Sequence, residues 1–201
     1  MTGKACLAGV LALALSSTEQ AATPPPTFVF NPYIRMIRCT LIEDGEIHHI
    51  SGTGFKLADG RWVSVNHVTS NLGCNIEGHP LTVTYADPVG DFSLFTTDLP
   101  LKGGLKVDCA GYIDRKWYHS QGYAEGWPVI RSLAIMSAWN MEWLGAERDW
   151  SVLVYNRVIP GMSGGPVLSD RGEVVGTVNA YNLAFPISFS RELKRTVICE
   201  N

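Results

Sequence analysis

Hydrophobic residues along this chain are grouped in short runs of β type, and glycine, proline, aspartate or asparagine separates one run from the next. The Ala58-Asp59-Gly60 segment between two of these runs is typical of a hairpin turn. No long amphipathic helix intervenes, so the spacing predicts an all-β sandwich or barrel. The predicted strands are Ile34 to Ile42, Gly52 to Leu57, Trp62 to Val65, Leu81 to Tyr85, Phe92 to Phe95, Leu105 to Ile113, Val129 to Ala138, Trp150 to Tyr155, Val174 to Ala180 and Leu183 to Phe189.

One later segment, from Ser190 to about Ile198, has the pattern of a short C-terminal helix. Ser190 can cap its N-terminus, and Glu192 carries a negative charge near that positive end of the helix dipole. Lys194 and Arg195 follow toward the opposite end, where positive charge is favourable.

The N-terminus has the layout of a secretory signal peptide over residues 1–22. Lys4 precedes the apolar run from Ala5 to Leu15, which is too short to span a bilayer as a stable helix. Small and polar residues then allow cleavage after Ser16, Ala21 or Ala22. Residues 23–27 form a proline-rich spacer, and the folded part is expected to begin at residue 28. An exported protein, secreted or periplasmic, is the prediction.

Composition and charge narrow the classes of partner. The 201 residues are 46% hydrophobic with a net charge of -3, as in an ordinary globular protein with one large or two small cores. The basic residues are scattered, so no surface for nucleic acid is expected. The cysteines lack the close pairs of zinc sites and His48-His49 are adjacent, so we expect neither a metal nor a cofactor.

Four cysteines remain after removal of Cys6 with the signal peptide, namely Cys39, Cys74, Cys109 and Cys199. An even number in an exported chain predicts one or two disulfides. Three connectivities are possible, and the sequence does not distinguish between them. Four reduced, buried cysteines are the alternative.

The stretch from Pro160 to Val167, Pro-Gly-Met-Ser-Gly-Gly-Pro-Val, places three glycines and two prolines around Ser163. A match to G-x-S-G-G-P arises by chance on the order of once in a million starting positions. Glycine permits positive φ and close approach of a ligand, so a tight turn that presents the serine is predicted. A serine hydroxyl is a weak nucleophile that needs a base and a group to orient that base.

His67 is the candidate base, because it follows the apolar strand from Trp62 and a loop there would leave the imidazole facing a cleft. Asp91 is the candidate orienting carboxylate, since the short strand Phe92 to Phe95 can hold it rigidly. The competitors occupy polar or turn-like surroundings and are the histidines His48, His49, His79 and His119 and the acids Asp87 and Asp98.

These residues resemble the motifs of the trypsin-like serine proteases of the chymotrypsin fold. The chain is most similar to short bacterial members such as the high-temperature-requirement type and the glutamyl endopeptidases. The matching segments are Gly52-Thr53-Gly54-Phe55, Val65-Asn66-His67, Asp91-Phe92-Ser93-Leu94 and Gly161-Met162-Ser163-Gly164-Gly165-Pro166, and the order His, Asp, Ser is the family's. The resemblance implies two six-stranded antiparallel β-barrels, the first over about residues 28–104 and the second over about 105–201, with the active site between them.

By this resemblance Ser163 attacks the peptide carbonyl, His67 serves as base and then acid, and Asp91 holds the imidazole tautomer. The backbone N–H groups of Gly161 and Ser163 form the oxyanion hole. Met162 stands where the digestive branch carries an aspartate that pairs with a freed N-terminus. The turn must therefore be held by packing or by a ligand.

The segment Gly176 to Tyr181 resembles the family's substrate-binding edge strand, which pairs with an extended peptide through main-chain hydrogen bonds. Asn179, Ala180 and Tyr181 are the candidate pairing residues. Arg157 is a candidate for the primary pocket, where it would favour an acidic or polar side chain, although a loop arginine is more often exposed.

The sequence thus predicts a serine endopeptidase that hydrolyses polypeptides through an acyl-enzyme intermediate. A non-catalytic module that retains the protease fold and binds a peptide or protein is the alternative. An esterase of the α/β-hydrolase type is a third possibility, because it shares a G-x-S-x-G motif. Its different triad order and its alternation of strands with helices disfavour it. The natural substrate and the oligomeric state stay open.

Overall fold

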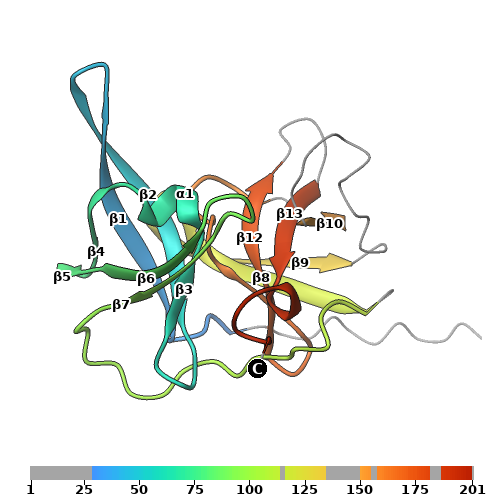
Figure 1. Ribbon diagram of the computed structural model, residues 1–201. Helices are drawn as coiled ribbons and strands as arrows, with labels where there is room; N and C mark the ends of the chain where they lie inside the picture. Colours follow the sequence, from blue (N-terminus) through green and yellow to red (C-terminus); the bar gives the residue numbers. More distant parts are fainter. Residues whose placement is uncertain (1–28, 114–115, 135–149, 155–157, 182–186, 201) are drawn as a thin grey trace, which may run out of the picture.

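Two antiparallel sheets, built from successive halves of the chain, lie side by side (Figure 1). The computed structural model describes residues 29–113, 116–134, 150–154, 158–181 and 187–200. Strands of the first sheet lie between residues 34 and 96, and those of the second lie between residues 117 and 192. The predicted signal peptide and spacer lie outside the described residues.

The first sheet has seven strands in the order β5-β4-β1-β2-β3-β7-β6, one more than expected. The additional strand is β5, which is two residues long. Among the described residues no strand pairing closes this sheet into a barrel. Its elements are β1 (Ile34–Glu43), β2 (Glu46–Lys56), β3 (Trp62–Ser64), α1 (Asn66–Thr69), β4 (Leu72–Ile76), β5 (His79–Pro80), β6 (Thr82–Asp87) and β7 (Phe92–Thr96).

The second sheet is a closed barrel of six strands in the order β10-β13-β12-β11-β8-β9, as the expected architecture requires. Closure leaves no free edge around the barrel as a whole, although individual strands extend past their partners. Its elements are β8 (Trp117–Ala124), β9 (Trp127–Ala134), β10 (Trp150–Val154), β11 (Pro166–Leu168), β12 (Val174–Tyr181) and β13 (Ile187–Glu192), followed by the 3₁₀ turn η2 (Leu193–Arg195).

The C-terminal helix is much shorter than the sequence suggests. Ser190 is not a helix cap but lies within β13, opposite Val178 of β12 and Ser151 of β10. The helical part is the single 3₁₀ turn η2. Ladder hydrogen bonds to two neighbouring strands outweigh the weak local preference of a short helical segment. The described part of the chain contains no helix long and apolar enough to cross a bilayer.

The hairpin predicted at Ala58-Asp59-Gly60 is confirmed, because Phe55 of β2 lies opposite Val63 of β3. Predicted runs also overlap β1, β6, β7, β9, β10, β12 and β13. The run from Leu105 to Ile113 is not a strand: its backbone makes two isolated bridges, Leu57 to Leu105 and Val107 to Val174. Strands β4, β5, β8 and β11 were not predicted.

Three apolar clusters form the core, one in each sheet and one between them. The cluster between the sheets unites Phe55, Val63 and Phe92 of the first sheet with Leu168 and Val174 of the second. Burial of these side chains fixes the two sheets against each other, since each removes a large apolar area from water. Loops of the first sheet and loops of the second sheet that adjoin this cluster are therefore held in fixed positions relative to one another.

Two disulfides join the four cysteines that the sequence singled out. Cys39 of β1 pairs with Cys74 of β4. Cys109, in the segment of chain that connects the two sheets, pairs with Cys199 near the C-terminus. Each bond closes a long loop and so lowers the entropy of the unfolded chain. The first bond links the neighbouring strands β1 and β4, and the second ties the segment that connects the two sheets to the C-terminal segment.

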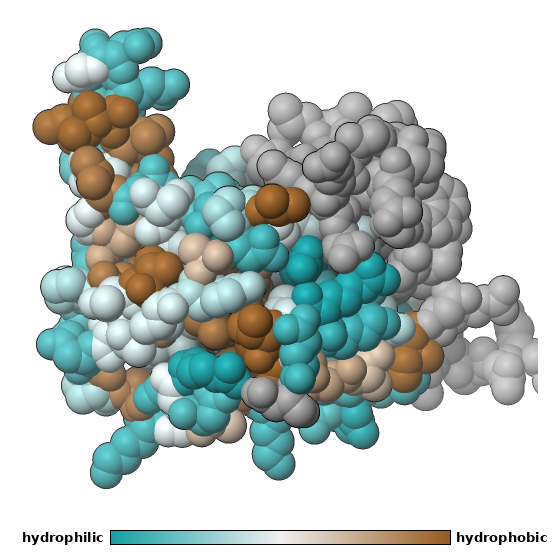
Figure 2. Space-filling model, in the orientation of Figure 1, coloured by the Kyte–Doolittle hydropathy of each residue, from teal (hydrophilic) through white to brown (hydrophobic). Residues whose placement is uncertain are grey.

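The far end of the β1–β2 hairpin projects from the body of the first sheet (Figures 1 and 2). Ile42 and Ile47 face each other near its tip and are 55% and 67% exposed. Neither side chain contributes to the three core clusters. The outer half of the hairpin is therefore held by its own ladder rather than by core packing.

We expect His119 of β8 to make the stability of the barrel depend on pH. Burial lowers the pKa of this 4% exposed histidine to about 4 from 6.5, and its Nε2 accepts a hydrogen bond from Gln121 Nε2 at 3.1 Å. The unfolded chain binds a proton first as pH falls. The free energy of unfolding should therefore drop by about 3 kcal/mol between about pH 6.5 and pH 4.

Urea unfolding at pH 7 and pH 4.5 measures this dependence. In His119→Gln the difference between the two pH values should shrink by most of that amount, because glutamine does not titrate. An equal difference in both proteins would show that His119 does not cause it.

Candidate active site

His67 and Asp91 come together because β3 pairs with β7. Ser64 at the end of β3 lies opposite Ser93 at the start of β7, so the residues just beyond these positions are neighbours. Asp91 occupies the turn before β7 with a φ of +52°, a conformation that aspartate tolerates better than most residues. His67 lies in α1, the single helical turn that follows β3, rather than in the loop we expected.

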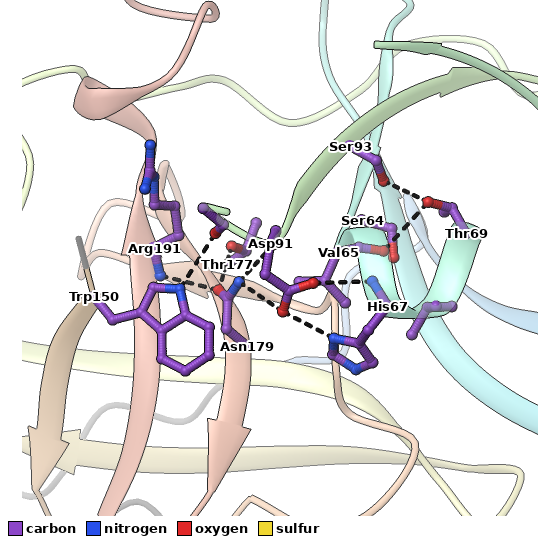
Figure 3. A network of polar contacts seen from close by, with 12 residues as sticks. Ser64, Val65, His67, Thr69, Asp91, Ser93, Trp150, Thr177, Asn179 and Arg191 are labelled. Carbon is purple, nitrogen blue, oxygen red and sulfur yellow. Dashed lines mark hydrogen bonds and ion pairs between the residues drawn. The ribbon is translucent and has the colours of Figure 1, made fainter. Parts of the chain in front are cut away.

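The Asp91 carboxylate accepts two hydrogen bonds from His67. Oδ1 lies 2.9 Å from the His67 backbone N, and Oδ2 lies 2.8 Å from ring Nδ1 (Figure 3). Burial raises the pKa of Asp91, but the hydrogen bonds and charge of His67 outweigh it and leave the pKa below its usual value. An ionised Asp91 requires the ring proton on Nδ1, so Nε2 keeps a free lone pair. His67 can therefore act as a base.

The second barrel holds Asp91 from the opposite side. Asn179 of β12 donates from Nδ2 to the Asp91 carbonyl oxygen at 2.7 Å and to Oδ2 at 3.4 Å. Asn179 Oδ1 in turn accepts from Thr177 Oγ1 at 2.8 Å and from the Arg191 backbone N at 3.0 Å. Trp150 Nε1 donates to the carbonyl oxygen of Gly90, the residue before Asp91, at 3.2 Å (Figure 3). These contacts restrict the carboxylate to one orientation.

The serine segment forms the tight turn that its glycines predict. Gly161 and Gly164 have φ values of +92° and +85°, which lie in the region that favours glycine. Gly165 N donates to the Met162 carbonyl oxygen at 2.9 Å across the half-buried Ser163. Met162 is fully buried in the core of the second barrel. Packing of Met162 thus anchors the turn at the position where an activating aspartate is absent.

Two short series of contacts join the serine turn to the His67–Asp91 pair. A Cβ at Gly164 would lie 2.2 Å from Ser64 Oγ, three residues before His67. Gly164 N donates to the carbonyl oxygen of Val178, which precedes Asn179, at 2.7 Å. Ser163, which directly precedes Gly164, is therefore near the segment that carries His67 and near Asn179, the side chain that holds Asp91. Within the described residues, no hydrogen bond joins the Ser163 hydroxyl to His67.

The backbone N–H groups of Gly161 and Ser163 donate no hydrogen bond to any residue that the structure describes. A side chain at Gly161 would collide with the rest of the barrel, because its Cβ would lie 2.5 Å from the Tyr123 carbonyl oxygen. Two unpaired N–H groups on one turn are available for an anion or a polarised carbonyl oxygen.

The fold resembles that of solved bacterial proteases. Neither a protein-family model nor a curated protein sequence matches the chain. The active form of the Rv3671c protease from M. tuberculosis superposes with a TM-score of 0.68 at 19% identity, over 81% of this chain and 77% of that one. AlgW, an HtrA-type protease solved with a tripeptide, gives 0.66 at 19% identity, over 84% and 60%. The serine endoprotease from Yersinia pestis gives 0.65 at 13% identity, over 80% and 58%.

The chain has the chymotrypsin-like double-barrel fold. Within this fold the described pairing of β11 with β12 ends at Thr177. Beyond it, Val178 exchanges backbone hydrogen bonds with Gly164 and Gly165, and no strand pairs with that side of Ala180 among the described residues. The Asn179 side chain is 2% exposed and hydrogen-bonded to Asp91. Tyr181 is the last residue of β12. Arg157 lies outside the described residues.

The sequence did not reveal the contacts that support the candidate residues. Asn179 was selected for its backbone, whereas its side chain holds Asp91. The contact of Trp150 with the Asp91 turn carries no local sequence signal, since packing of the second barrel on the first sheet brings the two together. Thr53 was noted as part of a matching segment, without a role.

Proposed function

We propose that this protein is a serine endopeptidase with Ser163 as nucleophile, His67 as general base and Asp91 as the orienting carboxylate. The observation that supports this most is the 2.8 Å contact between His67 and the buried Asp91, which lies beside the Ser163 turn in a fold shared with proteases. An ionised, buried carboxylate stabilises the imidazolium that forms when the histidine takes a proton.

The proposed reaction begins when His67 Nε2 removes the Ser163 hydroxyl proton and Oγ bonds to the substrate carbonyl carbon. The C–N bond then breaks, and the proton on Nε2 passes to the leaving amine. Water, deprotonated by His67, cleaves the acyl-enzyme ester and restores the serine. His67 is 48% exposed, so its free edge can reach both serine and substrate.

The oxyanion of each tetrahedral intermediate would be bound by the N–H groups of Gly161 and Ser163. Their lack of partners in the described structure supports this role. Donors that are already oriented need no reorganisation as negative charge develops, and each contributes about 3 kcal/mol in comparable sites.

A polypeptide is the proposed substrate, bound as an added strand beside β12 at Asn179, Ala180 and Tyr181. The edge of β12 at Ala180, past the contacts of Val178 with the serine turn, pairs with no other strand among the described residues, and this supports the mode of binding. Arg157 is proposed to contribute to side-chain preference. AlgW, which shares the fold, was solved with a bound tripeptide and a decapeptide.

We also propose that the protein is exported and that residues 28–201 form the protease unit after removal of residues 1–22. The two disulfides support this, because such bonds persist in oxidising compartments. The apolar N-terminal run after Lys4 supports an export signal.

A fluorophosphonate probe, which reacts covalently with activated serines, tests the proposed nucleophile. Wild type should label at a single site, and Ser163→Ala should not label. Mass spectrometry of the labelled peptide should place the adduct on Ser163. Ser169→Ala, at a buried serine six residues after Ser163, is the control and should label as wild type does. Equal labelling of wild type and Ser163→Ala would contradict the assignment.

A binding module without catalysis is the alternative that this experiment separates. The absence of a hydrogen bond between Ser163 and His67 in the described structure is the observation in its favour, although such contacts often tighten when substrate binds. Protein that neither labels nor cleaves a peptide library, yet binds peptides from it, would support the module.

A further inference from the structure

Thr53 lies in β2 and links the first sheet to the serine turn of the second. Its side chain is fully buried. Oγ1 donates to the Gly161 carbonyl oxygen at 2.7 Å and accepts from the Tyr123 backbone N at 2.9 Å. The backbone N of Thr53 donates to the Ser163 carbonyl oxygen at 2.8 Å. One residue therefore binds the carbonyl groups of both residues whose N–H groups form the candidate oxyanion hole.

These two hydrogen bonds fix the peptide planes beside those that carry the donors. Each peptide unit is planar, so binding the Gly161 carbonyl orients the whole 161–162 unit, and binding the Ser163 carbonyl orients the 163–164 unit. The 162–163 unit, which carries the Ser163 N–H, lies between them and is held by the bond from Gly165 N to the Met162 carbonyl. Rotation of the 162–163 unit would turn the Ser163 N–H and break the bond to the Met162 carbonyl. The Gly161 N–H belongs to the 160–161 unit, which directly precedes the fixed 161–162 unit.

The chemistry of the side chain suits this position. A hydroxyl can donate to one carbonyl and accept from one amide at the same time, and Thr53 Oγ1 does both. Neither valine nor alanine can replace those contacts, and they would leave the Gly161 carbonyl and the Tyr123 N–H unpaired. Serine retains both contacts. The Thr53 carbonyl oxygen accepts from Ser64 Oγ at 2.7 Å, which secures Thr53 itself next to the His67 segment.

We propose that Thr53 is a positioning residue that keeps the Gly161 and Ser163 amides aimed at one point, in place of an activating N-terminal ion pair. The inference rests on the proposed protease function. It assigns the maintenance of the oxyanion hole to a side chain of the opposite sheet. Packing of Met162 determines the position of the turn, and the hydrogen bonds of Thr53 determine the orientation of its peptide groups.

Kinetics of Thr53→Val with a peptide ester test this role, with Thr196→Val as the matched control. Thr196 is also buried, and its Oγ1 likewise donates to one carbonyl, that of Leu193, at 2.7 Å and accepts from one amide, that of Ile198, at 3.3 Å. Both variants should lose similar stability in thermal unfolding, since each loses one buried pair of hydrogen bonds.

Thr53→Val should lower kcat about 10- to 100-fold with KM within about twofold, less than the loss from deleting one oxyanion donor. Thr53→Ser should restore kcat to within about threefold of wild type, and Thr196→Val should leave it within about twofold. If Thr53→Val does not fold, Thr53→Ala and Thr196→Ala take the place of the valine pair. A kcat of the Thr53 variant equal to that of its Thr196 counterpart would overturn the proposal.

Hydrogen–deuterium exchange of a peptide covering residues 159–165 separates failure of this inference from failure of the protease function. The N–H groups of Met162 and Gly165 are hydrogen-bonded within this segment and that of Gly164 to Val178 of β12, so all three should be protected in wild type. Their exchange should accelerate in Thr53→Val and not in Thr196→Val, whether or not the protein proves catalytic. Equal exchange in the two variants would show that Thr53 does not hold the turn.

Discussion

Replacing Asp91 by asparagine is expected to lower kcat about 10⁴-fold, while KM for a peptide substrate stays within about threefold. Oδ1 of Asp91 accepts from the His67 backbone N–H, so the oxygen of an asparagine must remain there. Its NH₂ group then faces ring Nδ1 in place of Oδ2. Nδ1 must accept that hydrogen bond, which places the ring proton on Nε2 and removes the base.

The asparagine variant also brings two donors together, because Asn179 Nδ2 lies 3.4 Å from the Asp91 Oδ2 position. This contact adds to the loss of the tautomer and should lower the melting temperature slightly. Asp98→Asn is the control, since Asp98 Oδ1 lies 2.8 Å from His79 Nδ1 on the exposed surface. It should retain the activity of wild type. A decrease of less than about tenfold in Asp91→Asn would contradict the assigned role.

The candidate triad could be predicted because each member stands next to a local signal. Ser163 lies among glycines, His67 follows an apolar strand and Asp91 precedes one. The structure brings Asp91 and His67 into contact through strand pairing over 24 positions. The roles of Thr53 and Asn179 depend instead on contacts across 108 and 88 positions, between the two sheets. A single sequence carries no signal for such pairings.

Strand β8 shows why part of the fold could not be predicted from hydrophobic runs. Its central residues His119, Ser120 and Gln121 are polar and yet fully or almost fully buried. Hydrogen bonds satisfy the Gln121 amide, which accepts from Asn31 N and donates to the Val29 carbonyl oxygen of the N-terminal segment. The run from Leu105 to Ile113 shows the converse, because Leu105 is buried by packing between the sheets without a ladder.

Gly164→Ala is expected to lower the free energy of unfolding by about 4 kcal/mol, from about 1–2 kcal/mol of backbone strain and about 1–3 kcal/mol of steric conflict. Gly164 has a φ of +85°, and a Cβ there would lie 2.2 Å from both the Thr53 carbonyl oxygen and Ser64 Oγ. The Thr53 carbonyl belongs to the backbone of a central strand and cannot move aside. The turn must shift instead, which would also displace Ser163.

Gly60→Ala separates the two causes, because Gly60 has a φ of +95° and a Cβ added there would meet no atom within 4 Å. Gly60→Ala introduces the backbone strain without a collision, so it should lower the free energy of unfolding by about 1–2 kcal/mol. Urea unfolding of both variants measures the difference, and the rate of fluorophosphonate labelling reports whether the remaining folded Gly164→Ala protein keeps an ordered site. A cost for Gly164→Ala no larger than that for Gly60→Ala would mean that the two sheets are not in tight contact at this turn. Placement of Ser163 beside His67 depends on that contact, so the assignment of the catalytic triad would then lose its geometric basis.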